Sequence, residues 1–320
     1  MQPLESILMS GCLFVDNSML ETLRECPRKF FHQYVLHRTK PQDALRRGTI
    51  LHRLLECRYS KVLHNRVTPE LEAEQVTLLE QLWNETTWND PEDLRNSLSH
   101  LLELFIVRYN QIYTEESFQI ATINGKPAVE LPFVYEFGSF KLRGQTIRVF
   151  YCGKIDMVVK ENNKLWIVDF KSTSNLGSTF FDDKNSSSQF VGYITGIQQT
   201  TGQTCTGVMI HAVRTSTPPM KPRGQTLDQW WRSSFERDST HIYEWQLVEW
   251  QRQTTELLNW LFWLAERDTW TEFRTSCVGK FGACMFKPVC DTVPGLDKDE
   301  LLASTNYTHN DFTPLRKVNP

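Results

Sequence analysis

Two runs of β-forming residues joined by Asn162-Asn163 constrain the fold of this chain more than any other feature. Asparagine tolerates a positive φ better than other residues that carry a side chain, so this pair is typical of a two-residue hairpin turn. Such a turn fixes the register, because every residue i then faces residue 325 − i. Asp156 would face Asp169, and the strand period of two places Lys171 on the same face as Asp169. The hairpin therefore predicts two opposed carboxylates with a lysine beside them.

Opposed carboxylates destabilise a hairpin unless something lies between them. Their Cβ atoms would be about 4.5–5.5 Å apart, and like charges at that spacing repel. Asp169 also stands in an apolar run, where an unpaired carboxylate is costly. A divalent cation would turn the repulsion into ligation, and oxygen ligands suit Mg²⁺ or Mn²⁺. Such an ion can activate water for phosphoryl chemistry, and a nearby lysine can orient that water. The competing interpretation is a surface hairpin with scattered charges.

Helical and strand patterns around this hairpin predict an α/β fold. The capping-box pattern from Ser18 to Glu21 predicts a helix that begins at Ser18 and continues through Tyr34. The other predicted helices are 46–63, 69–84, 93–112, 187–200 and 240–267, and the predicted strands are 128–137, 146–151, 154–160, 164–170 and 204–213. We expect one domain over residues 1–320, with a helical section at 18–113, an α/β core at 125–213 and a helix with clustered cysteines at 240–292.

The bulk composition predicts a cytoplasmic protein without a membrane segment. The chain begins without a basic and then apolar leader, and no apolar run approaches the roughly 18 residues of a membrane span. Its eight cysteines are therefore expected to stay mostly reduced. The net charge of −3 does not indicate nucleic acid, but residues 24–66 hold eleven Lys and Arg against three acids. This stretch is either a solvated helical face or a wall that attracts phosphates.

The motifs around the two aspartates resemble those of a known family. Gly-Lys-Ile-Asp156 and Asp169-Phe-Lys171 resemble the first metal aspartate and the (D/E)xK element of the PD-(D/E)xK nuclease superfamily, in its RecB-type branch. The resemblance covers about residues 26–290 and implies a restriction-endonuclease-like core, a mixed central sheet flanked by helices. It implies that Asp156, Asp169 and the backbone carbonyl of Phe170 bind one or two Mg²⁺ or Mn²⁺ ions. Lys171 would position the attacking water or help to deprotonate it.

Three further motifs stand where this resemblance leads us to expect them. Gly48-x-x-x-His52 resembles a helical motif whose histidine reaches the metal, and Glu130 resembles the acidic residue that precedes the hairpin. Gln189 and Tyr193 resemble a Q-x-x-x-Y pair, and their spacing of four places both on one helical face. By residue chemistry alone, His52 could be structural, Glu130 an exposed strand residue, and the Gln–Tyr pair a capping or packing feature. The resemblance implies that all four lie near the active site.

Four cysteines have a spacing that suggests a ligand site. Cys277, Cys284 and Cys290 lie close together in sequence, and Cys26 is the candidate fourth thiol far upstream. Three thiolates need a fourth to complete a tetrahedral or [4Fe–4S] site, and the close C-x2-C pairs of a zinc ribbon are absent from the sequence. The pattern resembles RecB-type nucleases in which such cysteines hold a [4Fe–4S] cluster. We expect this cluster, with zinc as the alternative and reduced core cysteines as the interpretation without a ligand.

These features predict a metal-dependent DNA nuclease, most simply a single-stranded DNA exonuclease in replication, recombination or repair, encoded by a bacterium or a phage. Arg28, Lys29, Arg46 and Arg47 would guide the phosphate backbone. The sequence lacks a P-loop, so a helicase partner would supply any unwinding of DNA. The sequence also lacks a motif for sequence-specific readout of DNA. The alternatives are a CRISPR-associated adaptation nuclease that trims DNA and a catalytically silent DNA-binding scaffold subunit.

Aromatic residues offer a further way to hold DNA. Trp230, Trp231 and Tyr243 could stack on bases, although aromatic residues of this kind more often belong to a core.

Overall fold

The computed structural model describes residues 10–61, 66–185, 187–220, 224–279 and 282–292, together with 302, 307–309 and 314. Segments that alternate along the chain form two compact units. The first unit takes residues 1–41, 132–154 and 244–320, and the second takes 42–131 and 155–243. The sequence predicted consecutive sections, whereas each unit gathers segments from distant parts of the chain. The chain passes between the units within two long strands, β6 (Val129–Leu142) and β7 (Gln145–Glu161).

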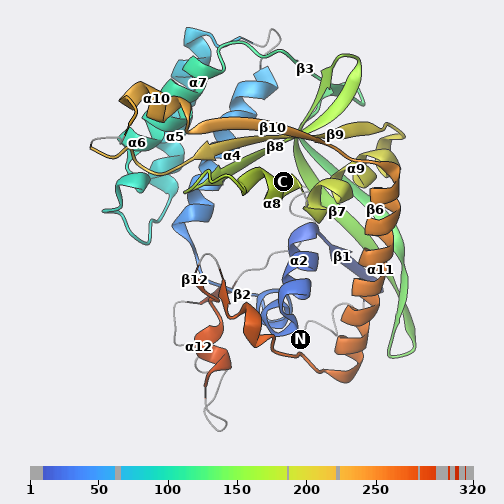
Figure 1. The fold of residues 1–320 in the computed structure, drawn as a ribbon. Helices are drawn as coiled ribbons and strands as arrows, with labels where there is room; N and C mark the ends of the chain where they lie inside the picture. Colours follow the sequence, from blue (N-terminus) through green and yellow to red (C-terminus); the bar gives the residue numbers. More distant parts are fainter. Residues whose placement is uncertain are drawn as a thin grey trace. The chain divides into compact units, whose positions relative to one another are not determined.

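A mixed sheet forms the centre of the second unit (Figure 1). The end of β7 pairs antiparallel with β8 (Lys164–Thr173), β8 pairs parallel with β9 (Cys205–Arg214), and β9 pairs antiparallel with β10 (Phe235–His241). The parallel pair requires a crossover, which contains α9 (Ser188–Thr201). The sequence prediction of an α/β fold with a mixed central sheet and flanking helices is confirmed.

The predicted hairpin turn forms at Asn162-Asn163, where φ is 50° and 61°. The predicted register holds along the ladder from Glu161↔Lys164 to Met157↔Val168. The ladder ends there, one pair short of the two aspartates. Beyond it, the backbone N–H of Phe170 donates to Asp156 Oδ2 at 2.8 Å. The expected direct pairing of Asp156 with Asp169 is therefore replaced by a bond from the side chain of Asp156 to the backbone of β8.

Helices pack on this sheet through one apolar core. The stripe predicted on the second helix, Ile50, Leu51, Leu54 and Leu55, is at most 2% exposed and packs in one cluster with core residues of β7 and β8. The elements of the second unit outside the central four strands are α4 (Asp43–Lys61), α5 (Pro69–Glu85), η2 (Leu94–Asn96), α6 (Leu98–Leu102), η3 (Glu103–Arg108), α7 (Tyr109–Ile112), β3 (Gln119–Ile120), β4 (Thr122–Ile123), β5 (Lys126–Pro127), α8 (Phe180–Asn185) and α10 (Leu227–Arg232).

The first unit begins with a strand and a capped helix. β1 (Cys12–Val15) pairs parallel with the start of β7. It leads into α2 (Asn17–Glu25), whose N-cap is Asp16, because its carboxylate accepts the N–H of Met19 at 2.8 Å. The capping box predicted at Ser18 is therefore wrong.

The predicted continuation of this helix through Tyr34 is also wrong. Cys26 is extended, with φ −165°, and Pro27 begins the separate helix α3 (Pro27–Phe30). Proline has no N–H to continue the ladder and fits the first turn of a new helix.

The long helix α11 (Glu244–Arg267) runs beside β6 in the first unit (Figure 1). Its remaining elements are η1 (Phe31–Val35), β2 (Arg38–Thr39), η4 (Arg274–Ser276), β11 (Val278–Gly279), β12 (Gly282–Ala283), α12 (Lys287–Cys290) and β13 (Thr308–His309). Within the described part of the chain, no helix combines the length and apolar character that crossing a membrane requires.

Candidate active site

Helix α4 lies close to strand β8 where Gly48 meets Ser172. A Cβ added to Gly48 would lie 3.3 Å from Ser172 Oγ, so the helix can approach this closely because residue 48 has no side chain. His52 follows one turn later, on the same helical face. The Gly-x-x-x-His motif therefore has a physical explanation, since the glycine allows the approach that brings the histidine to the sheet.

The imidazole of His52 reaches Asp156 on β7. His52 Nδ1 lies 3.2 Å from Asp156 Oδ1. Burial lowers the pKa of His52, but the charge and hydrogen bond of Asp156 outweigh burial and raise it to about 9. Burial raises the pKa of Asp156, yet the charge and hydrogen bond of His52 bring it below its ordinary value. Without a metal, a proton shared by these two groups supplies the positive charge that the carboxylate needs.

Glu130 on β6 completes a group of three potential ligands. One ligand atom from each of His52, Glu130 and Asp156 lies within 4.8 Å of the others. Glu130 has φ 48°, a left-handed conformation that is unfavourable for a residue with a side chain and interrupts the regular alternation of a strand. Such strain collects at functional sites, where surrounding structure compensates for it. The structure thus brings Glu130 together with His52 and Asp156, and its role as a ligand stays a prediction.

These donors fit a divalent cation. An imidazole nitrogen and two carboxylates are ligand types that Mn²⁺ accepts, and a carboxylate-rich site also suits Mg²⁺. Asp169 is a buried carboxylate that faces the Lys171 ammonium. Its side chain is 2% exposed, and its Oδ2 accepts no hydrogen bond of acceptable geometry, although Lys171 Nζ lies 2.8 Å away. Asp169 itself lies outside the group of three ligand atoms.

Lys171 stands at the centre of a polar chain on the other side of Asp169. Its Nζ lies 3.0 Å from Asp169 Oδ1 and donates to Gln189 Oε1 at 3.1 Å. Gln189 Nε2 in turn donates to the Tyr193 hydroxyl at 2.6 Å. Burial raises the pKa of Asp169, the Lys171 ammonium lowers it and Asp156 raises it, with a net increase. The structure thus brings together Lys171 and the Gln–Tyr pair that the sequence placed in separate motifs.

Two aromatic side chains that sequence reasoning missed hold Phe170, the residue between Asp169 and Lys171. Tyr59 stacks on the Phe170 ring at 5.7 Å, and His211 meets it edge-on at 5.1 Å. Tyr59 lies two turns after His52 on α4, so helical spacing could have indicated it. His211 is the strand partner of Phe170 in the β8–β9 ladder, a pairing that no local pattern reveals.

The basic residues expected to contact DNA differ in what they do. Arg47 is 5% exposed, and its guanidinium donates to Asn96. Burial of this kind leaves Arg47 unavailable to a phosphate backbone, which corrects its predicted role. Arg46 lies at the surface of the same helix, where Asp43 and Asn89 hold its Nη1 at 2.7 and 3.0 Å.

Arg28 and Lys29 belong to the first unit, beside the cysteines. Lys29 pairs with Glu25 at 2.6 Å and lines the same small pocket as the cysteines. The charge of Arg28 acts on the Cys290 thiol. Both cations therefore lie where they can stabilise thiolates, and their predicted contact with DNA stays a prediction.

The three aromatic residues that the sequence offered for base stacking differ in their exposure. Trp230 and Trp231 are 6% and 4% exposed and belong to the core of the second unit. Their stacking on bases is therefore excluded by burial. Tyr243 is 60% exposed.

The four cysteines singled out in the sequence line one small pocket of the first unit: Cys26, Cys277, Cys284 and Cys290. All are free thiols. Cys26 Sγ accepts the N–H of Phe273 at 3.4 Å, and the N–H of Cys284 donates to the carbonyl of Cys277 at 2.9 Å. Burial raises the pKa of Cys284, and it raises that of Cys290 to about 11. Four converging thiols with few polar partners fit a soft metal or a cluster.

Comparison with known proteins gives a family match and several distant structural likenesses, two of which are described below. A family model described as "PD-(D/E)XK nuclease superfamily" matches residues 17–291. A solved structure from Eubacterium rectale, described as "Putative exonuclease", has 12% identity and a TM-score of 0.47, covering 91% of this chain and 94% of that one. The structure of SSO0001 has 11% identity and a TM-score of 0.26, covering 67% and 87%. Neither structural likeness is close enough to carry an argument. A search of curated proteins gave no match.

Proposed function

Because the chain belongs to the PD-(D/E)XK nuclease superfamily, we propose that it is a deoxyribonuclease that hydrolyses phosphodiester bonds with Mg²⁺ or Mn²⁺. The observation that carries the proposal is the joint geometry of two groups in the second unit. His52, Glu130 and Asp156 offer ligand atoms within 4.8 Å, and Lys171 is held 3.0 Å from the neighbouring Asp169. A ligand set beside a fixed ammonium is the arrangement that metal-assisted phosphoryl chemistry needs.

The proposed ligands are His52, Glu130 and Asp156, with Asp169 and the backbone carbonyl of Phe170 as further members. A bound divalent cation would act as a Lewis acid and lower the pKa of water. Other residues of the chain position the side chains that would bind the metal. Gly48 sets the distance of α4, and the Phe170 N–H fixes the carboxylate of Asp156. His52 gives up its shared proton when it takes a metal, because only the neutral ring has a lone pair to offer.

Lys171 has the geometry of a group that positions water and offsets negative charge. Asp169 and Gln189 hold its Nζ from two sides, so the ammonium has little freedom. Tyr193 accepts the amide N–H of Gln189, which turns Gln189 Oε1 towards the lysine. We assign Gln189 and Tyr193 as positioning residues that act through Lys171. This intact set favours an active nuclease over a silent scaffold subunit.

We propose single-stranded DNA with free ends as the substrate, and exonuclease action in replication, recombination or repair. The support is the lack of a sequence-reading motif, since an enzyme without one gains specificity from ends and strand state. We also propose that the four cysteines hold a [4Fe–4S] cluster, with zinc as the alternative occupant. The support for this proposal is the pocket that the four cysteines share, because thiolates are the ligands that such clusters and zinc take.

The test is a cleavage assay with end-labelled DNA in Mg²⁺, Mn²⁺ and EDTA. Substrates with 5′- or 3′-blocked ends, single- and double-stranded, distinguish exonuclease from endonuclease action and give the polarity. We expect cleavage of single strands from a free end in Mn²⁺, none in EDTA, and a loss of about 10³-fold in Asp156→Asn. Cleavage that persists in EDTA, or that Asp156→Asn leaves intact, would refute the proposed site.

A further inference from the structure

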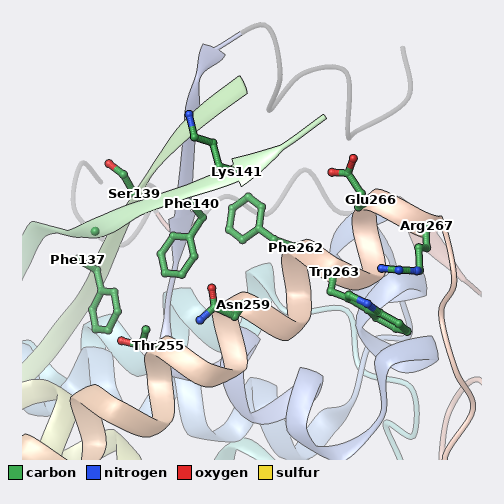
Figure 2. Close-up of a pocket in the computed structure, with 11 residues that line it drawn as sticks. Phe137, Ser139, Phe140, Lys141, Thr255, Asn259, Phe262, Trp263, Glu266 and Arg267 are labelled. Carbon is green, nitrogen blue, oxygen red and sulfur yellow. The ribbon is translucent and has the colours of Figure 1, made fainter. Parts of the chain in front are cut away.

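The first unit has an open groove between β6 and α11 that no proposed catalytic, metal or cysteine residue lines (Figure 2). Strand β6 supplies one wall and the second half of α11 the other. The lining consists of Phe137, Gly138, Ser139, Phe140 and Lys141 from the strand, and Thr255, Asn259, Phe262, Trp263, Glu266 and Arg267 from the helix. The groove therefore combines aromatic, cationic and hydrogen-bonding side chains in one place.

Aromatic rings form its floor. The rings of Phe140 and Phe262 stack at 5.2 Å with an angle of 1° between their planes. Figure 2 shows Phe137 and Phe140 directed towards α11, whereas Ser139 and Lys141 are directed away from it. Trp263 is 47% exposed, which is unusual for the largest apolar side chain and leaves much of the indole to a ligand. An exposed ring such as the indole of Trp263 can stack on other flat rings.

The charge around these rings is positive, although the whole chain carries −3. The Arg267 guanidinium lies 4.5 Å from the Trp263 ring, which extends the platform with a cation. The strand and turn from 137 to 147 contain Lys141 and Arg143 and no acid. Glu266 is the one acid in the lining, and its Oε2 accepts the backbone N–H of Arg143 at 2.7 Å. The lining thus holds two exposed cations, Lys141 and Arg267, against one carboxylate that already accepts a hydrogen bond, and this balance favours an anionic ligand.

We propose that this groove binds a segment of single-stranded DNA, with bases stacked on Trp263 and Arg267 and phosphates near Lys141 and Arg143. The choice of DNA as the ligand rests on the proposed deoxyribonuclease function. Stacking requires bases with free faces, which a single strand offers and a duplex does not.

The test separates stacking from charge. Full-length protein carrying Lys171→Ala is titrated, without added metal, against fluorescein-labelled oligo(dT) and an abasic strand of equal length, with anisotropy as the readout. We expect Trp263→Ala to weaken oligo(dT) binding about tenfold, in line with the stacking of about one base, and to leave abasic binding unchanged. Arg267→Ala should weaken both. Trp245→Ala is the matched control, since Trp245 is 66% exposed on the same helix, and it should bind as the parent does.

Three results would overturn the proposal: equal binding by the Trp263 and Trp245 variants, an equal loss on the abasic strand, or equal competition by duplex DNA. Sedimentation of each variant shows whether Trp263→Ala instead dissolves a dimer, which would assign the groove to a second copy of the chain. Wild-type cleavage in Mn²⁺ is measured separately. Cleavage with no Trp263 effect rejects the groove alone, whereas a Trp263 effect without cleavage rejects the proposed activity alone.

Discussion

In the second unit, the charged side chains of the candidate active site satisfy one another, whereas in the first unit four thiols share a pocket with few polar partners. His52 pairs with Asp156, and Lys171 pairs with Asp169 and Gln189. The cysteine pocket has weak sulfur contacts, such as the 3.4 Å bond from the Phe273 N–H to Cys26. The two proposed ligand sites therefore differ in how much of their structure exists before any ligand arrives.

This difference is the one expected between a site for catalysis and a site whose ligand stabilises the fold. The candidate active site has internal cations that pair with its carboxylates, so its side chains hold one another in place without a metal. The cysteine pocket joins residue 26 to residues 277–290, and a bound ligand would strengthen a connection that hydrogen bonds such as Ser276 Oγ to the Glu25 carbonyl already make. Loss of the ligand should accordingly affect activity in the first case and stability in the second.

Lys171→Ala gives the largest expected effect. Cleavage should fall about 10³-fold, because the group that positions water is removed. The variant should also lose about 2 kcal/mol of stability without metal, since the buried Asp169 loses its partner, and regain part of it in Mn²⁺. Cleavage rates and urea unfolding with and without Mn²⁺ measure both. Lys160→Ala, an exposed lysine on the opposite strand of the same hairpin, is the control and should stay within about threefold of wild type. If the control loses as much, the effect is a general one of charge.

The parts of the active site that could be predicted depend on local geometry. The turn at Asn162-Asn163 and its register followed from two residues, and the Gln189–Tyr193 contact followed from a spacing of four. The divergence of the strands before Asp156 and Asp169 could not be predicted, because it depends on the bond from the Phe170 N–H. The left-handed conformation of Glu130 is likewise set by its surroundings and has no sequence signal.

The strands show the same contrast between features that local sequence predicts and features that tertiary pairing decides. Strand β10, with the sequence Phe-Glu-Arg-Asp-Ser-Thr-His, was missed because an edge strand with largely polar residues lacks apolar alternation. Strand β1 was missed because four residues are too few to show a period. The strand runs predicted at 146–151 and 154–160 form one strand, β7. Tertiary pairing decided each case, so no local pattern could.

Cys290→Ser tests the other half of the comparison. Loss of one thiolate should weaken the ligand that closes a loop of more than 200 residues, and the free energy of unfolding should fall by about 3 kcal/mol. The measurement is urea unfolding, together with visible absorption and zinc and iron content. Cleavage per folded molecule should change less than twofold at low temperature. Cys12→Ser is the control, a half-buried thiol of the same unit outside the pocket. Equal stability of the two variants would show that the pocket holds no structural ligand.

Glu130→Gly and Glu130→Ala give the smallest expected effects on metal binding and stability, and they separate the loss of a ligand from the relief of backbone strain. Both remove a proposed ligand, so both should weaken Mn²⁺ binding by about tenfold, as titration followed by electron paramagnetic resonance of free Mn²⁺ would show. Only glycine adopts φ 48° without strain, so Glu130→Gly should be about 1 kcal/mol more stable than Glu130→Ala. Glu136→Gln, on the same strand, controls for the loss of charge. Both results together would show that the candidate active site, unlike the cysteine pocket, gives up stability for function. Equal stability of the two variants, or unchanged Mn²⁺ affinity, would remove that distinction between the regions.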